Sequence, residues 1–136
     1  MLLLALGVLA GCRRIEDIQQ NPLLGTCKLV GFGNTADNTF REAEPKDCEQ
    51  CYTITFREDG TFFGYTSTNE VGGRYIVETT AQKIEFINFG GTKINELPDG
   101  HVYADAFNSV NLFEINSNKL RLYYNNGLNF LLFNPK

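Results

Sequence analysis

The sequence has no tryptophan, one histidine and four cysteines in 136 residues, and acidic residues outnumber basic ones. Its formal net charge is −4, from 12 Lys and Arg against 16 Asp and Glu. Proteins that neutralise nucleic-acid phosphates need a concentrated basic surface, so this balance argues against a nucleic-acid partner. Few histidines and cysteines also argue against a zinc centre, which takes four ligands. The sequence suggests neither a metal nor another cofactor.

Long apolar runs are missing, apart from the first eleven residues. A membrane-spanning helix needs roughly 20 apolar residues, whereas residues 1–11 have the length of the apolar core of an export signal. The run ends in Leu9-Ala10-Gly11-Cys12, which resembles the bacterial lipobox, where signal peptidase II cuts before a diacylglyceryl-bearing cysteine. No basic residue precedes the run, which is expected if the true start lies upstream. We therefore expect a lipoprotein signal peptide at 1–11 and lipidation at Cys12.

Residues 12–22 form the lipidated cysteine and a polar tether that ends at Pro22. The ten residues that follow Cys12 in this segment reach at most about 35 Å when fully extended. Arginine, not aspartate, follows Cys12, which favours sorting to the outer membrane of a Gram-negative bacterium, with the domain in the periplasm or at the cell surface. The alternative interpretation is a buried N-terminal strand or helix in which the cysteine is incidental.

Residues 23–136 show the periodicity of an antiparallel β domain. Tyr52, Ile54 and Phe56 alternate with threonines, and Leu120 and Leu122 alternate with polar residues, as in half-buried strands. Strands are expected at 24–32, 52–56, 61–66, 75–77, 83–87, 120–124 and 128–133. Because no strand–helix–strand alternation is present, the pattern predicts an all-β fold, a barrel or sandwich of seven or eight strands.

Glycine and polar residues mark the connections. Asp59-Gly60 and Asn125-Asn126-Gly127 are hairpin signals, and residues 33–50 are expected to form a long polar loop. Pro98-Asp99-Gly100 predicts a turn, followed by one helix of at most two turns within 102–112. Gly64 and Gly73 fall in or beside strands, where glycine marks a bulge, a bend or a close backbone approach.

The stretch from Phe56 to Tyr75 resembles the META (HslJ-like) domain. The shared positions are a phenylalanine, a turn glycine, a second glycine, an asparagine and a Gly-x-Tyr, here Phe56, Gly60, Gly64, Asn69, Gly73 and Tyr75. Leu24 to Leu29 is similar to the opening of that family, Gly91-Thr92-Lys93 to its threonine-led turn, and 120–133 to its closing hairpin. The resemblance implies a barrel-like β fold in an exported lipoprotein linked to envelope stress, without a catalytic signature.

The chain also departs from the META pattern. Thr68 and Lys93-Ile94 stand where the family commonly has cysteines, and Cys27 stands at its tryptophan position. Any property that depends on that cysteine pair is therefore not implied here. A lipocalin-like small barrel is the rival fold. We expect Asn69 to have a structural role, because asparagine commonly bonds to the backbone of its own turn.

Three cysteines remain after Cys12. An oxidising compartment favours a disulfide, and Cys48 with Cys51 closes the shortest loop, provided that a turn brings their Cα atoms within about 7 Å. Cys27 is the alternative partner of either. A thioredoxin-type redox site is disfavoured because the motif leads into a strand, and zinc would find only Cys27 and His101 as further ligands.

No arrangement of residues indicates an enzyme. His101 lies in a turn, and the serines lack a nucleophile-elbow context. We therefore expect a non-catalytic protein that binds an unknown envelope protein or small ligand. Two alternatives are a carrier of a small apolar ligand, which requires an interior cavity of roughly 300 Å³ or more, and an inhibitor of an extracellular hydrolase that uses loop 33–50. Phe63, Tyr65 and Tyr123 are expected to face outward and to offer a partner surface.

Overall fold

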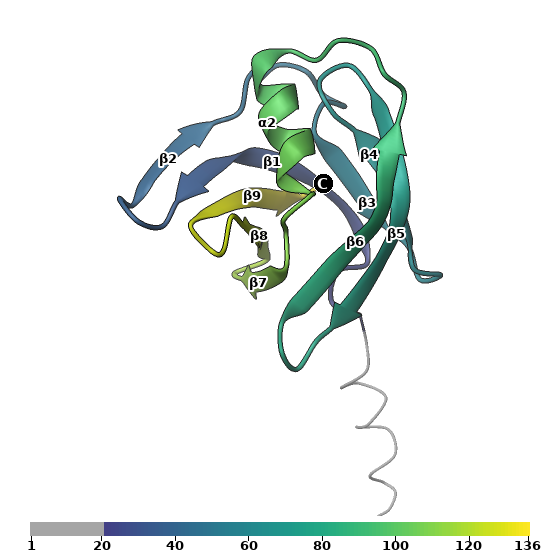
Figure 1. The fold of residues 1–136 in the computed structure, drawn as a ribbon, viewed down its shortest axis with the longest axis vertical. Coiled ribbons are helices and arrows are strands. Elements are labelled where there is room, and N and C mark those ends of the chain that lie inside the picture. The colour runs from purple at the N-terminus through teal and green to yellow at the C-terminus, as the bar shows by residue number, and fades with distance from the viewer. Residues whose placement is uncertain (1–20) are drawn as a thin grey trace, which may run out of the picture.

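The computed structural model describes residues 21–136, which form nine antiparallel strands and one helix (Figure 1). Cys12 and the predicted signal peptide lie outside the described residues. The strands are β1 Gly25–Asn34, β2 Thr39–Glu42, β3 Thr53–Phe56, β4 Thr61–Tyr65, β5 Glu70–Glu78, β6 Lys83–Gly91, β7 Leu112–Asn116, β8 Lys119–Tyr124 and β9 Asn129–Pro135, and the helix is α2 Pro98–Ala106. No helix among them is long and apolar enough to cross a membrane.

The sheet closes on itself through its first strand. Neighbours in the order β1-β3-β4-β5-β6-β7-β8-β9 are hydrogen-bonded, and β9 pairs with β1 to complete the ring. The first part of β1, from Gly25 to Lys28, pairs with β3, while Gly31 to Asn34 pairs with β2 along the same edge. The β1–β2 hairpin therefore continues the sheet beyond the β1–β3 pairing, with β9 on the other side of β1 and β2 as an edge strand (Figure 1).

The expected fold class is confirmed: the protein is an all-β barrel with one short helix. Two local predictions were wrong. The segment 33–50 is not a single loop, because β1 runs on to Asn34 and β2 returns along it. The helix begins at Pro98 instead of after the Pro98-Asp99-Gly100 turn, since proline is well suited to the first turn of a helix, where no intrahelical N–H bond is lost.

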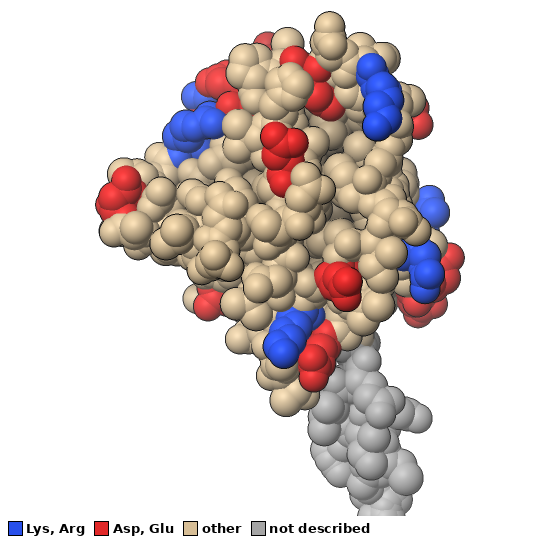
Figure 2. Space-filling model, in the orientation of Figure 1, with Lys and Arg blue, Asp and Glu red and all other residues tan. Residues whose placement is uncertain are grey.

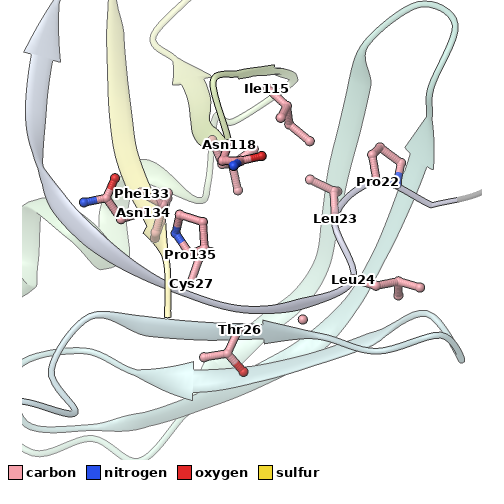
Figure 3. A pocket seen from close by; sticks show the side chains of 12 residues that line it. Pro22, Leu23, Leu24, Thr26, Cys27, Ile115, Asn118, Phe133, Asn134 and Pro135 are labelled. Atoms are coloured by element: carbon pink, nitrogen blue, oxygen red, sulfur yellow. The ribbon is translucent and has the colours of Figure 1, made fainter.

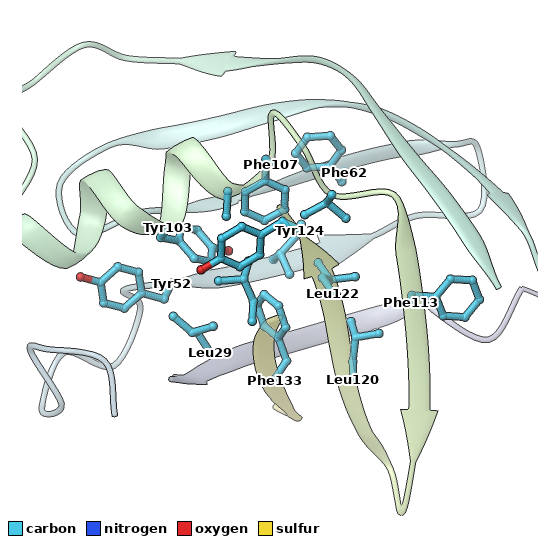
Figure 4. Close-up of a cluster of buried hydrophobic side chains, with 14 of the residues drawn as sticks. Leu29, Tyr52, Phe62, Tyr103, Phe107, Phe113, Leu120, Leu122, Tyr124 and Phe133 are labelled. Carbon is cyan, nitrogen blue, oxygen red and sulfur yellow. The ribbon is translucent and has the colours of Figure 1, made fainter. Parts of the chain in front are cut away.

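Side chains from strands and helix fill the barrel. Ile54, Phe56, Leu122, Leu131 and Phe133 are at most 2% exposed, as the alternation predicts. Helix α2 lies across one end of the barrel (Figure 1) and inserts aromatic residues into it (Figure 4). Tyr103 packs edge-on against Tyr52 and the adjoining Phe107. This cluster is a packed core, not a chamber.

Two glycines of the META-like stretch allow close strand approach. A Cβ atom at Gly64 would overlap the carbonyl oxygen of Thr53 on the neighbouring strand. The β5–β6 register shifts between Gly72 and Arg74, and a Cβ at Gly73 would lie 2.7 Å from the Ile87 carbonyl oxygen. Both positions match the bulge or close approach expected of glycine in a barrel strand.

Candidate functional site

The Cys48–Cys51 pair forms a disulfide in the structure, with Cα atoms 5.4 Å apart. Lys28 of β1 fixes this loop to the barrel, because its Nζ donates to the carbonyl oxygens of Cys48 at 2.7 Å and Cys51 at 2.6 Å. Burial is the largest cause of the lowered pKa of Lys28. Both of these hydrogen bonds go to backbone oxygens of the disulfide loop, so Lys28 anchors this loop to β1.

Cys27 is a free cysteine on β1, directly before Lys28. It lies beside an open pocket of about 190 Å³, whose lining includes Leu23, Ile115, Phe133 and Pro135 (Figure 3). Burial raises the pKa of its thiol to about 12. A thiol with so high a pKa is a poor nucleophile at neutral pH, so Cys27 behaves here as a small apolar side chain.

Asn69 is buried in a polar cluster that joins the β4–β5 turn to the segment before α2. Its Oδ1 accepts from Thr92 Oγ1 and from the Ile94 N–H, both at 2.7 Å. Its Nδ2 donates to the Ile94 carbonyl at 2.7 Å and to Glu96 Oε2 at 2.6 Å. Both amide ends are therefore engaged within the protein, but with the segment 92–96 and not, as the sequence suggested, with the backbone of the asparagine's own turn.

Glu96 is the centre of this Asn69–Glu96 cluster. Its carboxylate also accepts from the hydroxyls of Thr66 at 2.5 Å and Ser67 at 2.6 Å. Burial opposes ionisation of Glu96, but these hydroxyls and the Asn69 amide together outweigh it and lower its pKa. Sequence reasoning missed Glu96, because an isolated acidic residue in a polar segment gives no sign of its distant donors.

The remaining META-like residues lie apart from this cluster. Gly60 adopts a positive φ of 85° in the β3–β4 turn. Tyr75 donates from its hydroxyl to the Arg57 carbonyl oxygen at 2.7 Å and accepts from Asn21 Nδ2 at 2.6 Å. These contacts hold the start of the described chain to the barrel end opposite α2. Within residues 21–136, no group of three or more His, Cys, Asp or Glu is arranged to hold a metal ion.

A groove opens where the β1–β2 hairpin passes α2. Cross-strand pairing places Tyr124, Asn129, Asn34 and Thr39 in one row. The next row on the same face is Leu122, Leu131, Phe32 and Arg41. Val102 of α2 faces these rows across an open volume of about 380 Å³. We call this site the hairpin groove; its lining comprises Phe32, Gly33, Asn34, Thr39, Phe40, Arg41, Val102, Tyr124 and Asn129.

An ion pair fixes one wall of the groove to the helix. Arg41 binds both carboxylate oxygens of Asp99 at 2.9 Å, a bidentate arrangement that is stronger than a single contact. Asp99 also accepts the Glu44 N–H at 2.8 Å. Burial opposes ionisation of Asp99, and these bonds and the Arg41 charge outweigh it, so its pKa is lowered. The charge of Arg41 is thereby matched within the protein.

The outer face of the same strands has an apolar row. The register aligns Leu112, Tyr123, Phe130, Gly33 and Phe40 across five strands. Phe130 lies over Gly33, since a Cβ there would overlap its ring. Tyr123 is half-buried and Phe40 is 44% exposed. The pairing of Tyr123 in this row directs its side chain outward, as expected. Phe63, on β4, was also expected to face outward and is 37% exposed.

Charges are scattered over the molecule. Figure 2 shows acidic and basic side chains in ones and twos among uncharged atoms on one face, without a continuous basic area there. The salt bridge between Lys46 and Glu42 joins exposed groups near the base of the hairpin at 2.8 Å. Arg121 lies 4.9 Å from the Phe130 ring centroid and 3.6 Å from Glu114. The outer row is therefore flanked by matched charges.

Two solved structures share this fold. A crystal structure of a DUF4847 family protein from Bacteroides vulgatus matches with a TM-score of 0.64 at 18% identity, over 88% of this chain and 96% of that chain. An NMR structure of a protein from Burkholderia xenovorans matches with a TM-score of 0.67 at 22% identity, over 84% of this chain and 83% of that chain. At these identities the likeness establishes the fold alone. No protein-family model and no curated protein matches the sequence.

Proposed function

We propose that this protein is a lipid-anchored lipoprotein of the cell envelope, held at the outer membrane, whose barrel domain acts by binding and not by catalysis. The observation on which the anchor depends is the sequence Leu9-Ala10-Gly11-Cys12 at the end of a short apolar run. The surface that supports binding is the β1–β2 hairpin, which carries the hairpin groove on one face and the apolar outer row on the other.

The position of Asn21 fits a tethered domain. Asn21 is bonded to Tyr75 beside the β3–β4 turn, whereas the hairpin groove lies next to α2 at the far end of β1. The ten residues of β1 correspond to about 33 Å of extended strand. A tether attached at residue 21 would therefore leave the groove on the side of the domain that faces away from the membrane.

The two alternative functions receive less support. A carrier of apolar ligands needs an interior chamber, and the barrel interior is filled by aromatic and aliphatic side chains that are 0–7% exposed. An inhibitor was expected to use residues 33–50 as one stapled loop. Instead, this segment contains a hairpin, and the disulfide closes only the short turn at its end.

A META-like relationship remains part of the proposal. In its favour, Asn69 and the threonine-led turn at Thr92 contact each other, with Thr92 Oγ1 donating to Asn69 Oδ1. Two sequence pieces on which the resemblance rests thus meet in space. The short helix and the closing β8–β9 hairpin also lie in the order that the resemblance implies.

Metabolic labelling with palmitate tests the anchor. The wild-type chain should incorporate label and fractionate with membranes, and Cys12→Ala should abolish both, because the acyl groups are attached through that cysteine. The matched control is Cys27→Ala, which removes the other free thiol and should leave labelling intact. Label retained in Cys12→Ala would contradict the lipoprotein assignment.

A further inference from the structure

The hairpin groove has no unmatched charge among the described residues that line it. Arg41 is its only ionisable side chain besides Tyr124, and both guanidinium contacts go to Asp99. An anionic ligand would have to compete with this bidentate pair, and a cationic ligand would meet Arg41. The electrostatics of the groove therefore favour an uncharged ligand.

Uncharged hydrogen-bonding groups line the same groove. The side chain of Asn34 uses its Oδ1 to accept the N–H groups of Ala36 and Asp37. Within residues 21–136, its Nδ2 donates to no protein acceptor, and the hydroxyl of Tyr124 bonds to none. In the same row, the Thr39 hydroxyl donates to Asp37 and can still accept a hydrogen bond. The Asn129 amide is engaged by Asn125 and the Gly33 carbonyl oxygen. These groups suit a ligand that both donates and accepts hydrogen bonds.

Apolar surface lies between these polar groups. Val102 is 38% exposed on the helix side of the groove. On the strand side, the ring of Phe32 is buried beneath the Arg41 guanidinium group, 4.7 Å from its central carbon, and forms the floor of the groove. The open volume of about 380 Å³ falls within the range of small-molecule sites, about 300–1,000 Å³. Sugars present apolar C–H faces next to hydroxyl groups, and such a surface complements this lining.

We propose that the hairpin groove binds a neutral, hydroxyl-rich ligand of the oligosaccharide class. The proposal rests on the binding role proposed above and specifies its ligand. Tyr124 and Asn34 donate hydrogen bonds to sugar oxygens, and Val102 packs against the C–H face of a ring. Arg41 stays paired with Asp99 and forms the wall between the hairpin and α2.

Titration of the full-length lipidated chain in detergent micelles tests the proposal, with the side-chain amide resonances of Asn34 and Asn129 as the readout. The probes are two neutral trisaccharides, maltotriose and tri-N-acetylchitotriose, and one anionic trisaccharide, trigalacturonate. At least one neutral probe should shift both amides to saturation, and the anionic probe should bind more weakly. No saturable shift with either neutral probe, or preference for the anionic one, would overturn the proposal.

Two matched pairs of variants locate the site. Tyr124→Phe removes one hydroxyl inside the groove and should weaken binding about three- to tenfold, whereas Tyr123→Phe removes one on the outer face and should leave affinity unchanged. Val102→Trp should block the groove and weaken binding at least about tenfold, while the exposed neighbour His101→Trp should not. Equal effects within either pair would place the ligand elsewhere and refute the assignment.

A failure of the saccharide site can be distinguished from a failure of the proposed envelope function. Palmitate labelling at Cys12 and membrane fractionation do not involve the groove. A chain that is labelled normally but binds neither neutral trisaccharide would retain the envelope assignment and lose the saccharide site. An unchanged thermal midpoint in Val102→Trp shows that lost binding reflects a blocked site and not an unfolded domain.

Discussion

At the scale of single residues, the glycines show how closely the strands approach. Gly64 and Gly90 both occupy barrel strands, β4 and β6. The space beside them differs: a Cβ at Gly64 would overlap the Thr53 carbonyl oxygen, while a Cβ at Gly90 would have its nearest neighbour, the Asn88 oxygen, 4.0 Å away. Alanine substitutions at these two positions therefore test whether the close approach of β3 and β4 requires glycine at position 64.

Gly64→Ala should lower the free energy of unfolding by about 1–3 kcal/mol, because the added methyl group forces β3 and β4 apart. The matched Gly90→Ala should change it by no more than about 0.5 kcal/mol. Urea unfolding followed by circular dichroism measures both. Comparable losses in the two variants would show that close approach to Thr53 is not the cause.

Cys27 provides a second test at this scale. Burial raises the pKa of its thiol to about 12, so the thiolate population at pH 8 is far below that of a solvated cysteine. Iodoacetamide should therefore modify native Cys27 much more slowly than the same residue in denaturant. Peptide mass spectrometry of the non-reduced protein follows Cys27 separately from Cys12, and Cys48 and Cys51 are joined to each other. Similar rates in the two states would contradict a buried thiol.

At the scale of elements, α2 is connected to the barrel by two carboxylates, a buried one on Asp99 and a partly exposed one on Glu96. Asp99 binds Arg41 of β2, and Glu96, just before the helix, binds the β4–β5 turn. Both carboxyls have lowered pKa values. A lowered folded-state pKa means that the contribution to stability is complete above the ordinary pKa, 4.5 for Glu96 and 3.8 for Asp99, and is lost as the pH falls below it.

Thermal unfolding between pH 7 and pH 2 should show this loss. The wild-type midpoint should fall below about pH 4.5, because the unfolded chain then binds protons at Glu96 and Asp99 more readily than the folded protein does. Glu96→Gln should start from a lower midpoint at pH 7 and decline less steeply. Glu85→Gln, which changes an exposed carboxyl on β6, is the control and should follow the wild-type curve. Parallel curves for all three proteins would rule out a role for Glu96 in acid sensitivity.

Sequence reasoning recovered the strands because their apolar residues alternate, as Leu120, Leu122 and Tyr124 do. It singled out Asn69 but expected bonds to the backbone of its own turn, whereas the amide bonds to Thr92 and Ile94 in a segment more than 20 residues away. It did not recover the pairing of Arg41 with Asp99, since 58 residues separate them and neither belongs to a local motif. The hairpin groove was missed for the same reason: β2 is four residues long, exposed throughout and too short to show a period.

At the scale of the whole molecule, neighbouring strands of the barrel wall differ in how many residue pairs join them. Strands β1 and β9 share seven register pairs, whereas β6 and β7 share one, Lys83 with Leu112. Two further backbone bonds, from Ile84 to Asn111 and from Phe113 to Gln82, complete the β6–β7 seam. Phe107, beyond the end of α2, stacks on Phe89 of β6 at 4.6 Å and covers the inner side.

Hydrogen exchange should reveal this difference. Regions with few hydrogen-bonded neighbours open at lower free energy than the global unfolding transition. The amides of Ile84 and Phe113 should therefore exchange faster than those of the β1–β9 ladder, under conditions where closing is rapid. Native-state exchange measured by NMR gives both rates. Protection at the seam equal to that of β1–β9 would show that the barrel opens only as a unit.

The pairing of β1 with β9 also bears on how the chain is made. The strand that closes the ring, β9, lies far from β1 in the sequence, and the Lys136 N–H bonds to the Thr26 carbonyl oxygen at 3.0 Å. Contacts between such distant segments form slowly, and no shorter nascent chain can complete them. A polypeptide of this topology therefore remains an open sheet, with the β1 edge unpaired along the β9 side, until β9 has emerged from the ribosome.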